Sequence, residues 1–146
     1  MANENFSEDF YEAAIRHWIG GCILEDVQEY DSAVCMHGFS AECALKKIWE
    51  TMDTSNPPKK YSHFGEALFR DISMMLYDAT GVTDVIAPAG ALRLANIHLP
   101  QVLFQKHPDR RYFCDNTYSA EDTKICRDAA QDLLLEMVRM RLDGYI

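Results

Sequence analysis

Apolar residues recur every three to four positions along most of the chain, which is the spacing of one face of an α-helix. This pattern predicts a first helix over residues 8–28, a second over 31–52 and a third from Ser62 to Gly81. It also predicts a last helix over 119–143. No segment alternates apolar and polar residues as a half-buried β-strand does. The pattern therefore predicts an all-α protein.

Helix-capping side chains lie where these periodic segments begin. Ser7, Asp31 and Ser62 are the expected N-caps of the first three helices. Ser119 and Asp122 have the spacing of a capping box before the last helix. Four main helices joined by short loops, with one irregular helical segment, predict an antiparallel up-and-down bundle of four to five helices.

The irregular segment lies between the third and the last helix. Pro88 is expected to open a short helix, and Pro100 to kink or interrupt it, because proline lacks an amide hydrogen and its ring clashes inside a helix. Residues 106–118, KHPDRRYFCDNTY, are expected to form a connecting loop.

The composition is that of an ordinary globular protein, with 48% hydrophobic and 25% charged residues. We expect residues 1–146 to form one domain, which at this length buries about two-thirds of its unfolded surface. The longest apolar run, over residues 18–24, is far shorter than the ~20 residues that cross a bilayer. Five cysteines without a CxxC pair, and an N-terminus without a secretion signal, favour a reduced, cytoplasmic setting.

Charge is unevenly distributed along the chain, whose net charge is −9. Residues 1–50 carry ten acidic and three basic residues, whereas residues 91–114 carry four basic residues and one acidic residue. An acidic chain disfavours indiscriminate coating of nucleic acid. The basic segment, residues 91–114, is compatible with one local basic site.

The second predicted helix contains polar residues that its apolar pattern does not explain. His37, Glu42 and Lys46 lie in the stretch CMHGFSAECALKKIW, most of which is expected to be buried. Glu42 and Lys46 are four residues apart, in the favourable order for an ion pair within a helix. In so apolar a helix, we expect the carboxylate to face a fixed cation from elsewhere, and Arg111 is the candidate.

Two roles for Glu42 stay open. In the first, which we favour, a bidentate pair with Arg111 pins the loop that contains Arg111 onto the bundle. In the second, the same pair lines a nucleotide pocket. The candidate ligand-binding residues of that second interpretation are His37, Glu42, Lys46, Arg110, Arg111 and Tyr112.

Five short motifs follow one another along the chain: EDVQEYDSAV, HGFSAECALKKIW, YSHFGEAL, PDRRYF and YSAEDTKICRDAAQDLL. Their order and spacing over residues 8–140 resemble the HEPN domain family, small helical domains associated with nucleotide and RNA chemistry. The resemblance implies a bundle of four or five helices, commonly a homodimer. Some members are metal-independent ribonucleases, often toxins restrained by a small nucleotidyltransferase partner, and others are binding or assembly modules without catalytic residues.

The nuclease members resemble one another in an arginine followed a few residues later by a histidine, which Arg93 and His98 match here. Such a histidine moves a proton at the 2′-hydroxyl or the leaving oxygen, and the arginine neutralises charge on the phosphate. This chain departs from the family pattern twice. Leu94 stands where a polar residue usually follows the arginine, and Pro100 stands where a tyrosine is common.

We therefore favour a catalytically degenerate module that associates with nucleotide or RNA and acts with a partner such as a nucleotidyltransferase. The alternatives are a ribonuclease that uses Arg93 and His98, and a structural adaptor whose acidic first half binds a basic protein. His17, His63 and His107 are isolated in the sequence. Because no HExxH motif, paired-cysteine motif or Walker phosphate loop occurs, no metal and no cofactor are expected.

Overall fold

The computed structural model of the chain describes residues 7–52, 62–78, 94 and 96–146. All regular structure in these residues is helical, which confirms the predicted all-α class. In the same residues, every helix is too short or too polar to serve as a membrane span. The elements are α1 (Phe10–Asp26), α2 (Tyr30–Met52), α3 (Gly65–Asp78), α5 (Gln101–Phe104), the 3-10 helix η3 (Asp109–Tyr112) and α6 (Ala120–Leu142).

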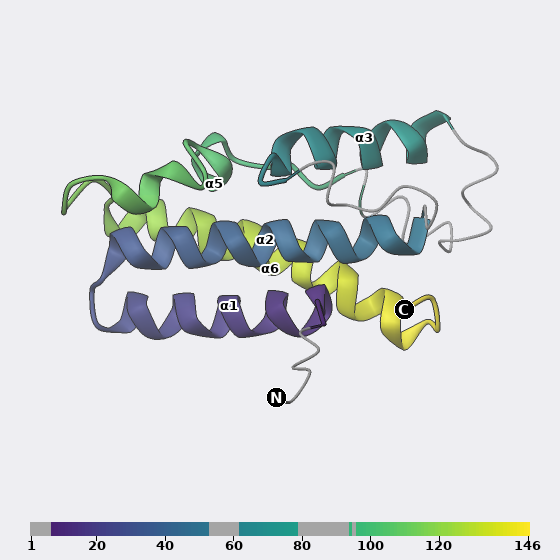
Figure 1. Cartoon of the computed structure of the whole chain (residues 1–146), viewed down its shortest axis with the longest axis horizontal. Helices are drawn as coiled ribbons and strands as arrows, with labels where there is room; N and C mark the ends of the chain where they lie inside the picture. The colour runs from purple at the N-terminus through teal and green to yellow at the C-terminus, as the bar shows by residue number, and fades with distance from the viewer. Residues whose placement is uncertain (1–6, 53–61, 79–93, 95) are drawn as a thin grey trace, which may run out of the picture.

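Helix α2 lies at the centre of the bundle (Figure 1). It packs against α1 and α6 and also contacts α3, α5 and η3. In Figure 1, α3 and α5 lie on the side of α2 opposite α1, and α6 lies behind it. Helices α1 and α6 are antiparallel, because Tyr11 near the start of α1 lies against Arg141 near the end of α6, and Glu25 near the end of α1 pairs with Arg127. Its central place explains why α2 is buried on almost all sides.

The apolar positions predicted at helical spacing form most of the core. Fully buried side chains come from α2, α3 and α6 and include Leu45, Ile48, Leu68, Ile72, Leu133 and Met137. Each such side chain contributes about 1.5–3 kcal/mol through its burial. Three residues of the predicted apolar pattern are exposed instead, and one of them, Phe64, directly precedes the first residue of α3. Val27 lies beyond the last residue of α1, and Ile125 lies on the outer side of α6, next to the buried Cys126.

Two helices begin later than predicted. The N-cap of α1 is Asp9 and not Ser7, and its carboxylate accepts a hydrogen bond from the amide of Glu12 at 3.0 Å. Helix α3 begins at Gly65, so Ser62 does not cap it. An N-cap requires an extended backbone, whereas Ser62 has φ of 47° in the preceding turn.

Asp31 does not cap its own helix as predicted but binds the segment before α6. It lies inside the first turn of α2, and its carboxylate accepts hydrogen bonds from the amides of Asn116 at 2.7 Å and Tyr118 at 2.8 Å. The capping box of Ser119 and Asp122 is confirmed, with both of its hydrogen bonds present. These contacts place the start of α6 beside the start of α2.

The segment between α3 and α6 lies partly outside the described residues. The predictions for Gly81 and Pro88 fall there. Pro100 directly precedes α5 and occupies its N-cap position. Residues 106–118, predicted as a loop, contain η3.

Close approach of neighbouring segments explains two glycines of the bundle. Helices α1 and α2 lie close together at Gly21, where an added Cβ would lie 2.5 Å from the nearest atom of the His37 ring. Gly20 has open space beside it. At Gly38 the neighbours are α5 and the segment after it, because an added Cβ would meet the guanidinium of Arg110 and the carbonyl of Leu103.

Candidate functional site

A buried carboxylate at the middle of α2 is the centre of the candidate site. The side chain of Glu42 is almost fully buried, with the residue only 3% exposed. Its Oε1 atom lies 2.9 Å from Nδ1 of His63 and 3.4 Å from Nε2 of His107. Its Oε2 atom lies 3.6 Å from Nζ of Lys46, which confirms the predicted pair within the helix. Three segments of the chain thus converge on one acid.

The surroundings of Glu42 keep it ionised. Burial by itself raises the pKa of this carboxyl. Hydrogen bonding to His107, the charge of Lys46 and hydrogen bonding to His63 act in the opposite direction and outweigh burial, so the pKa of Glu42 is lowered. The site therefore presents a charged oxygen to two imidazoles.

The predicted pair between Glu42 and Arg111 is wrong. Arg111 is exposed, and its guanidinium lies 4.9 Å from the ring centroid of Tyr112, which is itself 75% exposed. Both side chains stand on the outer side of η3. Histidines, and not an arginine, reach Glu42 from outside its own helix.

Arg110 performs the pinning role that was predicted for its neighbour. It is buried, and its guanidinium donates to backbone carbonyls rather than to a carboxylate. One acceptor belongs to α2 and the others lie around α5: they are Val34 at 3.3 Å, Val102 at 2.7 Å, Leu103 at 2.5 Å and Gln105 at 3.3 Å. These bonds attach the α5–η3 segment to the start of α2, so this arginine serves the fold.

His37 lies in the contact between α1 and α2, away from the Glu42 cluster. It is fully buried, and neither ring nitrogen has a hydrogen-bond partner among the described residues. Burial lowers its pKa to about 4, and the nearby charge of Arg127 acts in the same direction. The structure therefore does not bring His37 together with the other candidate ligand residues.

Only one residue of the predicted catalytic pair lies among the described residues. Arg93 lies outside the described residues. His98 is exposed, in the non-helical stretch that leads to α5. Catalysis by this pair stays a prediction.

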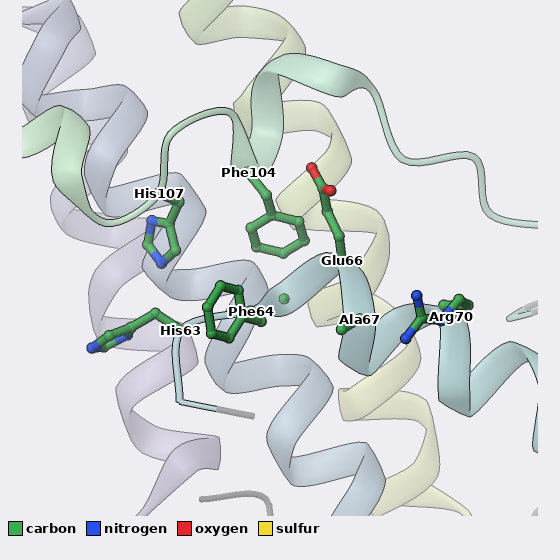
Figure 2. Close-up of a pocket in the computed structure, with 8 residues that line it drawn as sticks. His63, Phe64, Glu66, Ala67, Arg70, Phe104 and His107 are labelled. Carbon is green, nitrogen blue, oxygen red and sulfur yellow. The ribbon is translucent and has the colours of Figure 1, made fainter. Parts of the chain in front are cut away.

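A cavity of about 410 Å³ opens beside the Glu42 cluster. It lies between the first turns of α3 and the segment after α5 (Figure 2). His63 and His107 occupy one side of it in this view, Arg70 the other, and the rings of Phe64 and Phe104 lie between them. Phe64 is 70% exposed, so a large aromatic face is open to solvent at the cavity.

Aromatic packing positions the two histidines and the cavity wall. The ring of Phe39, on α2, lies 4.6 Å from the ring of His107 and 5.9 Å from that of His63, measured between centroids. Phe104 packs directly on Gly65, where an added Cβ would lie 2.5 Å from its ring. A glycine at the start of α3 therefore allows the α5 segment to close on it.

The partners of Glu42 could not be recognised from spacing. His63 lies 21 residues from Glu42, and His107 lies 65 residues from it. No local motif links such distant positions, and only packing of the turn before α3 and the segment after α5 brings them together. The one available signal was that each histidine lies in or beside a short motif of the HEPN resemblance, YSHFGEAL and PDRRYF.

Comparison with known proteins identifies no relative. No family model matches the chain, and no curated protein and no solved structure matches it. The resemblance to HEPN domains therefore rests on the motifs of the sequence, and the chemistry of the site rests on its own residues.

Proposed function

We propose that this protein is a HEPN-like binding module, without catalytic activity of its own, that holds a nucleotide or a single-stranded RNA segment in the cavity beside α3. The observation that carries the proposal is the combination of an exposed aromatic ring, an arginine and two imidazoles around one cavity of about 410 Å³. Small-molecule sites commonly measure roughly 300–1,000 Å³.

Each group at the cavity matches one part of a nucleotide. The exposed ring of Phe64 provides a surface on which a base can stack. Arg70 provides a planar guanidinium for a phosphate, and its ion pair with Asp71, at 3.5 Å and on the surface, is weak enough to be exchanged. The first turn of α3 adds backbone amides and the positive end of the helix dipole.

Glu66 favours a nucleotide over a free phosphate ion. Its carboxylate lines the same cavity, and Figure 2 places it beside Phe104. A carboxylate repels phosphate but accepts hydrogen bonds from sugar hydroxyls and base amino groups. A ligand with a base, a sugar and a phosphate therefore fits this lining better than a simple anion does.

The resemblance implies a homodimer and a nucleotidyltransferase-type partner, and α1 has a face suited to a second copy. Ile19, Ile23 and Val27, each one turn apart, are exposed along one side of this helix end. A self-complementary apolar stripe of this kind is typical of a two-fold contact between identical chains. We infer that a second copy of the chain covers this stripe.

Titration calorimetry with adenosine, AMP, ATP and a short single-stranded RNA, in the presence of a chelator, tests the ligand site. Phe64→Ala should weaken binding roughly 5- to 150-fold, because stacking on an aromatic side chain contributes about 1–3 kcal/mol per base. Arg70→Ala should weaken binding of phosphate-bearing ligands but not of adenosine. Tyr112→Ala is the matched control, because this exposed aromatic lies on η3, in the loop suggested by the sequence.

Three results would contradict the proposal. The first is that the folded protein binds none of these ligands. The second is that Tyr112→Ala weakens binding and Phe64→Ala does not, which would move the site to η3. The third is that the RNA is cleaved and that Arg93→Ala with His98→Ala abolishes the cleavage, which would make the protein a ribonuclease.

A further inference from the structure

We propose that Glu42, His63 and His107 form a binding site for a divalent transition-metal ion of the zinc type. Each residue offers one ligand atom, and these atoms lie within 4.8 Å of one another. Imidazole nitrogens and a carboxylate oxygen are ordinary ligands of Zn²⁺, and two histidines with one glutamate make a three-residue set that leaves a fourth position open. The inference does not depend on nucleotide binding, because it concerns the metal alone.

The spacing of these atoms is close to that of a tetrahedral ion. Ligand atoms at about 2.0–2.1 Å from zinc in a tetrahedron lie about 3.3 Å from one another. Oε1 of Glu42 lies 2.9 Å from Nδ1 of His63 and 3.4 Å from Nε2 of His107, which bracket that value. The two histidine nitrogens, which lie within 4.8 Å of each other, can approach by movement of His63. Its side chain is 44% exposed in the turn before α3.

The charge of the site suits a monodentate carboxylate. A carboxylate binds a metal in its deprotonated form, which is also the form that pairs with the ammonium group of Lys46. Lys46 faces Oε2 at 3.6 Å, so it can orient the carboxylate through the oxygen that does not face the histidines. When a metal ion takes the place of the hydrogen bonds between the two histidines and Oε1, the contact between Lys46 and Oε2 can stay as it is.

Two features predict reversible rather than structural binding. The ammonium group of Lys46 opposes a dication, and Nδ1 of His107 is buried without a hydrogen-bond partner among the described residues. Metal-bound histidines usually donate their second N–H to an acceptor, and loss of that support weakens affinity about 10- to 100-fold. We therefore expect a chelator to remove the ion without unfolding the bundle.

We expect the open coordination position to be reached from the cavity, because two of the three ligand residues line it. His63 and His107 both line its wall, whereas Glu42, on α2, is buried and is not among the residues that line it. A water molecule from the cavity can complete a tetrahedral set around the ion. The site is thus accessible to the metal and to exchangeable ligands from the same side.

Titration of the tag-free protein with Co²⁺, followed by displacement with Zn²⁺, tests the site. Cys22 and Cys114, the cysteines that are not buried, are first replaced by serine so that thiols do not compete. We expect one equivalent of Co²⁺ with the visible absorption of a tetrahedral complex. His63→Gln should weaken binding at least tenfold. His17→Gln should leave it unchanged, because the ring of this neighbouring histidine packs on Phe39, at 5.9 Å between centroids, and is not one of the three ligand residues.

Controls separate a specific site from a folding defect. His63 is partly exposed, so its variant should keep the helical circular dichroism of the parent, and Glu42→Gln provides a second loss of a ligand. The proposal is overturned if binding is not saturable near one equivalent, or if His63→Gln binds as tightly as the parent. Nucleotide binding is measured in a chelator, so the failure of either proposal leaves the other intact.

Discussion

Two adjacent glycines in α1 provide a matched test of how this helix packs on α2. An added Cβ at Gly20 meets nothing within 4 Å. At Gly21 it would lie 2.5 Å from Cε1, 2.7 Å from Nδ1 and 2.8 Å from Nε2 of the His37 ring. Because His37 is fully buried, its ring has no solvent-filled space into which it can turn. The same substitution should therefore stabilise the protein less at Gly21 than at Gly20, or destabilise it there.

The size of the difference follows from two terms. Replacement of glycine by alanine inside a helix stabilises it by about 1 kcal/mol, and this gain applies at both positions. Overpacking of a close-packed interior costs about 1–3 kcal/mol, and this cost applies only at Gly21. We therefore expect Gly20→Ala to raise the free energy of unfolding by about 1 kcal/mol. Gly21→Ala should be less stable than Gly20→Ala by about 1–3 kcal/mol.

Urea denaturation followed by far-ultraviolet circular dichroism measures both values. The double variant Gly21→Ala with His37→Ala removes the ring that the new methyl group meets, so a double-mutant cycle should return a coupling energy of the same order as the difference. Equal stabilisation by the two glycine variants would refute the close packing of α1 on His37.

Two further predictions concern pH and assembly. Because burial lowers the pKa of His37 from 6.5 to about 4, the unfolded chain binds a proton between these values that the folded chain does not, so stability should fall as the pH decreases through this interval. The free energy of unfolding should fall by on the order of 3 kcal/mol across this interval. In His37→Leu, urea denaturation at several pH values should no longer show this fall. The same pH dependence in the variant and the parent would contradict a buried, neutral His37. Analytical ultracentrifugation should give a dimer that Ile23→Glu dissociates and Leu135→Glu, at an exposed position of α6, does not; a monomeric parent protein would contradict the α1 contact.

Local sequence determined the helices of this protein because each depends on residues only a few positions apart. The predicted second helix, 31–52, differs from α2 by one residue, and the capping box of Ser119 and Asp122 marks the start of α6 as expected. The sequence also identified Glu42 as an acid in an apolar helix, and Lys46 as its partner one turn away. Both inferences use the helical repeat alone.

Tertiary structure decided which distant groups meet that acid. A 3-10 turn rotates each residue by about 120° from the last, so one position separates the inward Arg110 from the outward Arg111, and four residues are too few for a periodic pattern to tell them apart. The two histidines reach Glu42 only because α3 and the α5 segment pack on the same side of α2. Contacts of this kind depend on how whole helices and loops pack together. They cannot be predicted from the spacing of residues that are neighbours in the sequence.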